Sequence, residues 1–333
     1  MEYRILGRTG VHVSSLCFGT MSFGGDADEP TSAAMFKRCR EAGINFFDTA
    51  NVYTGGRSEE ILGRLIAGER DNIVLTSKVN FPVGEDLNAR GTSRRHIMLS
   101  VEASLKRLGT DRLDVYFLHS FDPYTPMEES LRALDDLVTA GKILYPAVSN
   151  WAAWQIAKAQ GIAAQEHLAR FECIQPMYSL VKRQAEVEIL PLALSEKIGV
   201  ISYSPLGGGL LSGKYSKESR PESGRLVENA MYKVRYGDAS YLENAERFTA
   251  YAQEKGIHPA TLAVAWVMSH PAITAPIIGA RNVEQLEPSL AAADLEMTPE
   301  WRAEISAFTP QPPPATDRTE EQKGMSYGAV KTK

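Results

Sequence analysis

The segment Asn45-Phe46-Phe47-Asp48-Thr49-Ala50-Asn51-Val52-Tyr53 decides how the rest of the chain is interpreted. The residues from Ile44 to Phe47 form an apolar run, which predicts a short buried strand. The run ends on the Asp48 carboxylate, and the Tyr53 phenol follows in a loop that continues into two glycines. The segment therefore predicts a strand that leads directly into side chains able to transfer protons.

Two later strands end on groups of the same kind. Lys78 follows the apolar run Ile73–Ser77, and His119 follows Asp114–Leu118. A phenol has a pKa of about 10 and is a poor proton donor at neutral pH, but a nearby ammonium lowers that pKa. Taken singly, each of these residues has an ordinary structural role, such as a cap, a loop aromatic or a solvated lysine. Their joint placement after three strands favours a proton-transfer site.

Strand and helix patterns alternate along the chain. Apolar runs predict eight strands, at 15–19, 44–47, 73–77, 114–118, 143–148, 172–175, 199–203 and 273–278. Helical apolar spacing separates them, and such alternation predicts parallel strands, of which eight close into a (β/α)8 TIM barrel. A small β-hairpin (3–6 with 11–13) precedes the first strand.

We expect one barrel domain over residues 1–309. Residues 310–333 are Pro-rich and then polar, so this C-terminal extension cannot build a core; it trails in solvent or folds over the barrel mouth. The stretch Ser212–Ser240 is a long loop that contains glycines and charges. Loops of this length in a compact domain are often functional lids, and we expect a partial lid here.

Composition excludes several classes of protein. Of the 333 residues, 44% are hydrophobic and 23% are charged, as in soluble globular proteins. A net charge of -5 without a basic stripe argues against nucleic-acid binding. The three cysteines are too few and too widely spaced for a disulfide framework or a zinc site. The N-terminus lacks signal-peptide regions, and no apolar run approaches the roughly 20 residues that cross a bilayer. We expect a reduced, cytoplasmic protein that binds no membrane.

With these residues in this order, the sequence resembles an aldo-keto reductase. The resemblance extends from Leu6-Gly7-Arg8-Thr9-Gly10 through Gly279-Ala280-Arg281-Asn282. Only the tail beyond about residue 310 is unmatched. The resemblance implies NADPH-dependent reduction of a small-molecule carbonyl, an aldehyde or a ketone. It implies that Tyr53 is the general acid, that Lys78 lowers the pKa of Tyr53, that Asp48 holds Lys78, and that His119 orients the carbonyl.

The resemblance also implies a cofactor site. The residues it assigns to NADPH are Gly19, Ser149, Asn150, Gln175, Tyr203, Ser204, Pro205, Leu206, Gly208, Gly213, Lys214, Ile278, Gly279, Arg281, Gln285 and Ser289. The chain departs from the family pattern at Pro146-Ala147 and at Ser289, where the family usually has a glycine-containing step and an Asn. Residues 208–214 have P-loop spacing, yet Tyr215 replaces the Ser or Thr that would hold magnesium, so we assign this segment to the dinucleotide.

Arg281 predicts which dinucleotide is used. Its guanidinium suits a phosphate, and Asn282 is expected to cap the next helix, whose first backbone donors favour an anion. No acidic residue adjoins Arg281 in the sequence; the nearest, Glu284, is expected one helical turn further on. Together with the resemblance, this pattern predicts a preference for NADPH over NADH.

An apolar substrate pocket is also expected. Its predicted walls are Met21, Phe23, Val52, Phe81, Tyr124 and Trp151.

Two alternatives remain open. A metal-dependent barrel hydrolase also places His, Lys and Asp at strand ends, although the six histidines here are scattered and form no H-x-H pair. The second alternative is a regulatory protein that uses the same fold to sense a cofactor, because fold alone does not prove catalysis.

Overall fold

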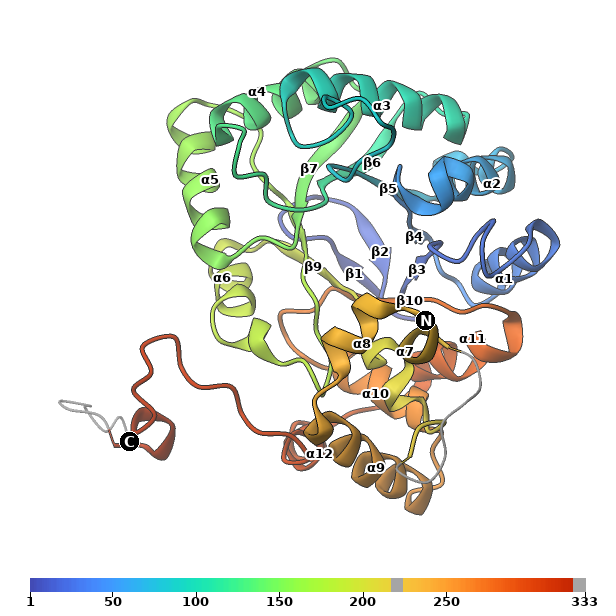
Figure 1. The fold of residues 1–333 in the computed structure, drawn as a ribbon, viewed down its shortest axis with the longest axis vertical. Helices are drawn as coiled ribbons and strands as arrows, with labels where there is room; N and C mark the ends of the chain where they lie inside the picture. Colours follow the sequence, from blue (N-terminus) through green and yellow to red (C-terminus); the bar gives the residue numbers. More distant parts are fainter. Residues whose placement is uncertain (217–223, 326–333) are drawn as a thin grey trace.

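The computed structural model describes residues 1–216 and 224–325, and its centre is a closed barrel of eight parallel strands (Figure 1). Around the barrel the strand order is β10-β3-β4-β5-β6-β7-β8-β9. The strands are β3 (Cys17–Gly19), β4 (Phe46–Asp48), β5 (Val74–Val79), β6 (Leu113–Leu118), β7 (Ile143–Ser149), β8 (Cys173–Gln175), β9 (Gly199–Ser202) and β10 (Ala275–Ile278). The predicted (β/α)8 barrel is confirmed.

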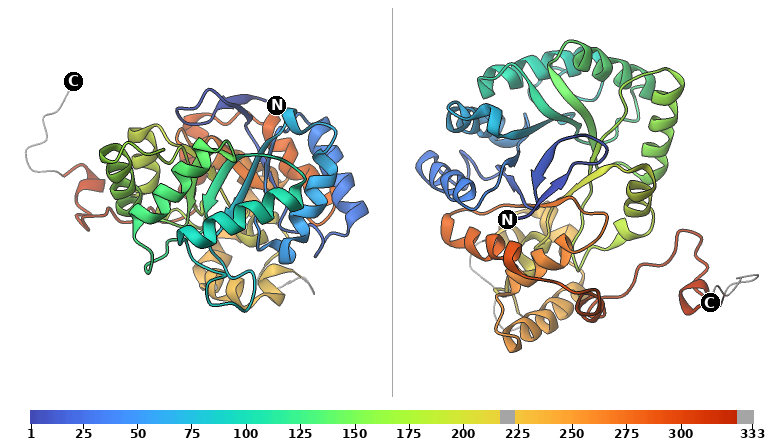
Figure 2. Two further views of the ribbon diagram at one scale, coloured as in Figure 1. Left: turned by 90° about the horizontal axis from the view of Figure 1, so that it is seen from above. Right: turned by 180° about the vertical axis from the view of Figure 1, so that it is seen from behind.

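The predicted hairpin closes one end of the barrel. It consists of β1 (Tyr3–Ile5) and β2 (His12–Ser14), which pair antiparallel, and it covers the barrel in the view from behind (Figure 2, right). Leu6 and Val13 are fully buried in the same apolar cluster as the inward-facing strand residues Phe46 and Phe117. The turn requires a glycine at position 7, where φ is +57° and an added Cβ would lie 2.6 Å from the backbone nitrogen of Gly199.

Helices surround the barrel and bury their apolar faces against the outside of the strands (Figure 1). They are α1 (Glu29–Glu41), α2 (Arg57–Ile66), α3 (Arg94–Leu108), α4 (Met127–Thr139), α5 (Ala153–Gln165), α6 (Ile189–Glu196), α9 (Ala239–Glu254), α10 (Pro259–Met268), α11 (Val283–Leu290) and α12 (Pro299–Ser306). None of the helices within the described residues combines the length and the apolar character that crossing a membrane requires.

Asn282 caps α11, because its side chain accepts a hydrogen bond from the backbone N–H of Gln285 at 2.9 Å, as expected. Serine often caps helices, but Ser58 does not cap α2. Helix α2 begins at Arg57 after Gly56, and the Ser58 hydroxyl instead donates to the backbone oxygen of Thr20 at 2.8 Å.

The expected loop Ser212–Ser240 contains helices in its described part. Helix α7 (Arg225–Glu228) and helix α8 (Ala230–Tyr236) lie within it, and α9 begins before it ends. Residues 217–223 lie outside the described part of the chain. Helices α7 and α8 lie on the face of the barrel opposite the hairpin (Figure 2, left).

The C-terminal segment departs from the barrel. From Pro310 to Met325 the chain is largely exposed and runs away from the helices in Figure 1. Residues 326–333, the end of the predicted tail, lie outside the described residues.

Candidate active site

The Lys78 ammonium connects the side chains that were predicted to transfer protons. Its Nζ donates to Asp48 Oδ2 at 2.6 Å, to the backbone oxygen of Thr49 at 2.7 Å and to the Tyr53 hydroxyl oxygen at 3.2 Å. An ammonium has three N–H donors, so all three are used. The side chain of Lys78 is completely buried. Because its charge and its donors are fully matched, the lysine is held in one position behind Tyr53.

Neighbouring strands bring these groups together. Asp48 ends β4 and pairs in register with Thr76 of β5. Lys78 lies two residues further along β5, not beyond its end, because the strand extends to Val79 and not to Ser77 as expected. The short helix η1 (Tyr53–Gly56) begins at Tyr53 and returns the phenol toward the barrel axis.

A second layer of hydrogen bonds fixes the Asp48 carboxylate. Its Oδ1 accepts from the Thr76 hydroxyl at 2.6 Å and from Gln175 Nε2 at 3.0 Å. Thr76 was not among the predicted site residues. The signal that could have identified it is its position, two residues before Lys78 on the same face of the strand.

Burial dominates the proton affinities of the site. It raises the pKa of the Tyr53 phenol above its ordinary value, and Lys78 opposes this effect without cancelling it. Burial also acts to lower the pKa of Lys78, but Asp48 and Tyr53 leave that pKa above its ordinary value. The phenol is therefore protonated at neutral pH and the lysine is charged.

His119 follows β6 and lies beside Tyr53, with the two ring centroids 5.9 Å apart. Burial, assisted by Lys78, lowers the pKa of His119 well below its ordinary value, so the imidazole is neutral. Its Nδ1 is buried and has no hydrogen-bond partner. A buried N–H without an acceptor is more costly than a bare lone pair, so the proton is assigned to Nε2.

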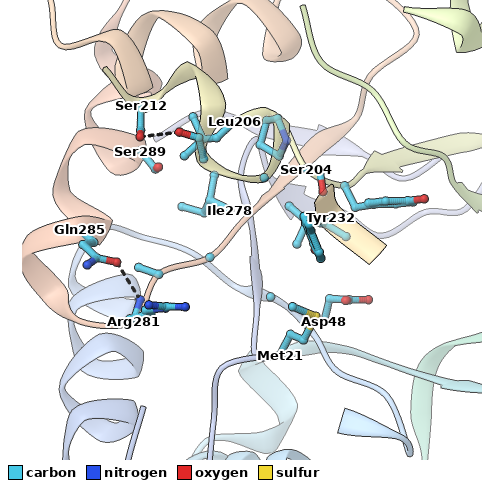
Figure 3. A pocket seen from close by; sticks show the side chains of 18 of the residues that line it. Met21, Asp48, Ser204, Leu206, Ser212, Tyr232, Ile278, Arg281, Gln285 and Ser289 are labelled. Carbon is cyan, nitrogen blue, oxygen red and sulfur yellow. Dashed lines mark hydrogen bonds between the residues drawn. The ribbon is translucent and has the colours of Figure 1, made fainter. Parts of the chain in front are cut away.

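A cavity of about 780 Å³ opens in front of these residues. Asp48, Tyr53 and His119 line it at one end, whereas Arg281, Gln285 and Ser289 line it at the other. Figure 3 shows the separation, with Asp48 and Met21 on one side and Arg281 and Gln285 on the other. All the residues predicted to bind cofactor line this cavity except Gly213. Gly213 instead ends the short helix η4 (Gly207–Ser212) with φ at +83°.

Polar side chains that line the cavity next to His119 bond to one another. The Tyr203 hydroxyl donates to Asn150 Oδ1 at 2.7 Å, and Asn150 Nδ2 donates to Ser149 Oγ at 3.1 Å and to the backbone oxygen of His119 at 3.0 Å. Asn150 and Ser204 both have φ near +59°, a conformation that costs energy in residues other than glycine. Such strain is common where backbone must present groups to a ligand.

Arg281 has acidic neighbours, contrary to the sequence-based expectation. Its guanidinium forms ion pairs with Asp26 at 3.0 Å and with Glu228 at 3.5 Å. Both carboxylates are remote in sequence. Asp26 lies in the loop between β3 and α1, and Glu228 ends α7. An interpretation based on adjacent sequence positions had no means of finding them.

Half of the predicted substrate wall lies elsewhere. Met21, Val52 and Phe81 line the cavity, and the Phe81 ring lies 4.7 Å from that of His119. Among the others, Phe23 is buried against Phe18. The last two do not line the cavity either: Trp151 packs between Phe121 and Phe171, and Tyr124 is 94% exposed.

Helix α8 supplies three wall residues that the sequence did not predict. Met231, Tyr232 and Arg235 all line the cavity. The helix follows no strand, so the rule that site residues follow strand ends could not find them. The only local sequence signal for this helix face is the spacing of Tyr232 and Tyr236, which lie one helical turn apart. Among the described residues no three His, Cys, Asp or Glu side chains form a possible metal site.

Known proteins resemble this chain along almost its whole length. The model of the aldo/keto reductase family matches residues 15–309. "Uncharacterized oxidoreductase YrpG" of Bacillus subtilis is 38% identical, with 94% of this chain and 97% of that protein covered. A "Probable voltage-gated potassium channel subunit beta" of Oryza sativa is 36% identical, with 95% and 99% covered.

A relative that is named a reductase also matches the chain. "Norsolorinic acid reductase stcV" of Emericella nidulans is 36% identical, with 90% of this chain and 79% of that protein covered. The family match extends over the whole barrel and includes every strand that carries a predicted catalytic residue. The chain therefore belongs to the aldo/keto reductase family and is an oxidoreductase.

Proposed function

We propose that this protein reduces aldehydes or ketones to alcohols with NADPH, and that Tyr53 is the general acid. One observation carries the proposal. The Tyr53 oxygen accepts a hydrogen bond from Lys78 Nζ at 3.2 Å, so its own O–H is left to point into the cavity. A phenol that is half-buried, protonated and part of the cavity wall is suited to donate a proton to a developing alkoxide.

The residues of the cavity fit a nicotinamide dinucleotide. Hydroxyl and amide groups of Ser149, Asn150 and Gln175 lie near the catalytic end, where they suit a carboxamide. Lys214 and Arg281 line the other part, where they suit phosphates. When bound, the cofactor supplies the hydride.

Side chains of the protein orient the carbonyl and supply the proton. Neutral His119 donates from Nε2 to the substrate carbonyl oxygen and orients it. Tyr53 then gives its proton to that oxygen, and the charged Lys78 stabilises the phenolate that remains. Asp48 keeps Lys78 in place. A positioned acid of this kind contributes typically about 10²–10⁴ in rate.

The preference for NADPH rests on Arg281. A 2′-phosphate would compete for its guanidinium with Asp26 and Glu228, and all three groups are partly exposed. Exposed ion pairs are worth about 0–1 kcal/mol, whereas a doubly charged phosphate gains charge-assisted hydrogen bonds that are roughly twice as strong as neutral ones. We therefore expect the 2′-phosphate to displace Asp26 and Glu228 from Arg281.

The test is Tyr53→Phe in a panel of simple aldehydes, followed by loss of reduced-nicotinamide absorbance. The variant lacks only the hydroxyl, so we expect normal folding and a loss of at least about 100-fold in kcat. Thermal unfolding with and without NADPH checks that fold and cofactor binding persist. Near-normal turnover by the variant would remove Tyr53 from the mechanism.

A second candidate function is regulatory. A relative that is 36% identical is named a potassium channel subunit, and a cofactor-sensing role on the same fold needs no rapid turnover. The same aldehyde panel separates the two. Binding of NADPH without reduction of any aldehyde would favour the sensor.

A further inference from the structure

Helix α8 presents two different faces. Tyr232 and Tyr236 are buried, whereas Lys233 and Val234 are exposed. Met231, Tyr232 and Arg235, which lie at positions i, i+1 and i+4 of one helical face, line the cavity. Arg235 is thus turned toward the cavity, while Lys233, two residues away, is turned toward solvent.

The absence of a side chain at Gly208 lets helix α8 pack closely against η4. The rings of Tyr232 and Tyr236 stack with centroids 6.2 Å apart. They approach the backbone of η4 so closely that a Cβ on Gly208 would lie 2.8 Å from Tyr232 Cδ1 and 3.1 Å from Tyr236 Cε2. The position of Arg235 is therefore set by aromatic packing.

Within residues 1–216 and 224–325, no carboxylate balances the charge of Arg235. Its guanidinium lies 5.1 Å from the centroid of the Tyr232 ring and 3.5 Å from Met231 Sδ. No carboxylate in residues 1–216 or 224–325 forms an ion pair with it. The lining carboxylates are otherwise engaged or remote: Asp48 binds Lys78, and Glu284 lies at the start of α11 beside Arg281.

Arg235 belongs to the catalytic half of the cavity. Burial is the main reason that the pKa of Tyr53 is raised, and Tyr232 adds to it. Burial raises the pKa of Tyr203 to about 12, with Arg235 opposing. Figure 3 shows Tyr232 on the same side of the cavity as Asp48 and Met21, away from Arg281 and Gln285. The guanidinium of Arg235 lies against this Tyr232 ring, so Arg235 is on the catalytic side. A half-buried cation that lines the catalytic side of the cavity, and that has no carboxylate partner in residues 1–216 or 224–325, is suited to recognise an anion.

We propose that Arg235 forms a subsite for the carboxylate of the substrate, so that the favoured substrates are aldehydes that carry a carboxylate at the far end from the carbonyl. This inference rests on the proposed function and names its substrate class. The planar guanidinium fork matches a carboxylate in a bidentate manner, and the Tyr232 ring beside it covers the carbon chain between the two groups.

The experiment compares matched substrate pairs. Succinic semialdehyde is set against butanal, and 4-carboxybenzaldehyde against 4-methylbenzaldehyde, each with saturating NADPH. In the wild type we expect kcat/KM to favour the carboxylate member of at least one pair. Arg235→Ala should reduce the carboxylate-to-neutral ratio by about 10- to 100-fold, the range for hydrogen bonds to charged groups, and mostly through KM.

Two variants complete the design. Lys233→Ala removes the same charge from the same helix on its solvent face, and the ratio should not change. Arg235→Lys keeps the charge but not the fork, and should recover part of the ratio. Far-UV circular dichroism and the unfolding temperature check that α8 still packs in each variant.

The outcomes are distinct. No turnover of any aldehyde would reject the proposed function. Turnover of neutral aldehydes with a ratio that Arg235→Ala leaves unchanged would overturn the carboxylate subsite alone. Equal losses for both members of a pair would also overturn it, because Arg235 would then act on the cofactor.

Discussion

Tyr53 illustrates how a single side chain gains its character from its surroundings. The sequence suggested that the neighbouring lysine would lower the pKa of the phenol. In the structure burial outweighs the lysine and raises that pKa, because a phenolate removed from water loses its hydration. A protonated phenol is what the proposed role of Tyr53 as general acid requires.

These proton affinities predict the pH dependence of reduction. Tyr53 must be protonated, and a pKa raised above 10.0 means that activity falls only as the pH rises beyond that value. His119 must be neutral, and a pKa well below 6.5 means that activity falls only at lower pH. We expect kcat/KM for a neutral aldehyde to be flat from about pH 6.5 to about pH 9.

The matched variant is His119→Asn, which keeps a hydrogen-bond donor but cannot titrate. An inflection near pH 6.5 in the wild type that is missing in this variant would show that His119 ionises in the working range, contrary to the assignment of a neutral ring.

Among the elements, the strands were predictable and helix α8 was not. Apolar runs mark buried strands directly in the sequence, and Asp48 and His119 could be placed because site residues follow strand ends in this fold. The partners of Arg281 and the position of Arg235 depend on how distant segments pack. Asp26 and Glu228 become neighbours of Arg281 only in three dimensions, and Tyr232 and Tyr236 of α8 pack closely on Gly208, which is remote in sequence. Local sequence patterns show neither the partners of Arg281 nor the position of Arg235.

The packing of α8 on η4 gives an element-scale prediction. In Gly208→Ala the residue keeps a φ of +69° and its new Cβ meets Tyr232. A left-handed conformation costs a non-glycine residue about 1–2 kcal/mol, and displacement of Tyr232 should also raise KM for aldehydes. Urea unfolding and steady-state kinetics measure the two effects.

Gly141→Ala is the control for backbone strain. Gly141 has the same φ of +69° with no atom within 4 Å of an added Cβ. It should lose comparable stability while its KM for aldehydes stays at the wild-type value. If both variants change KM alike, the contact between Gly208 and Tyr232 does not shape the cavity.

At the scale of the whole molecule, the far end of the cavity joins three segments that are remote in sequence. The loop before α1 contributes Asp26, α7 contributes Glu228, and the turn after β10 contributes Arg281. In the absence of a phosphate the two carboxylates neutralise the arginine. A 2′-phosphate that binds there must replace them, so under the proposed function the same contacts would set both a preference for NADPH and its limit.

This competition makes opposite predictions for the two sides of the ion pair. Arg281→Ala should weaken NADPH binding by roughly 1.5–3 kcal/mol, the range for charged hydrogen bonds, and leave NADH little changed. Asp26→Asn should tighten NADPH binding by up to about 1 kcal/mol, because the phosphate no longer displaces a carboxylate from Arg281.

Calorimetric titration with each dinucleotide measures both effects. Arg64→Ala controls for net charge, because Arg64 is an exposed arginine that pairs with Glu29 away from the cavity. Equal losses of NADPH and NADH affinity in Arg281→Ala would mean that this arginine does not bind the 2′-phosphate.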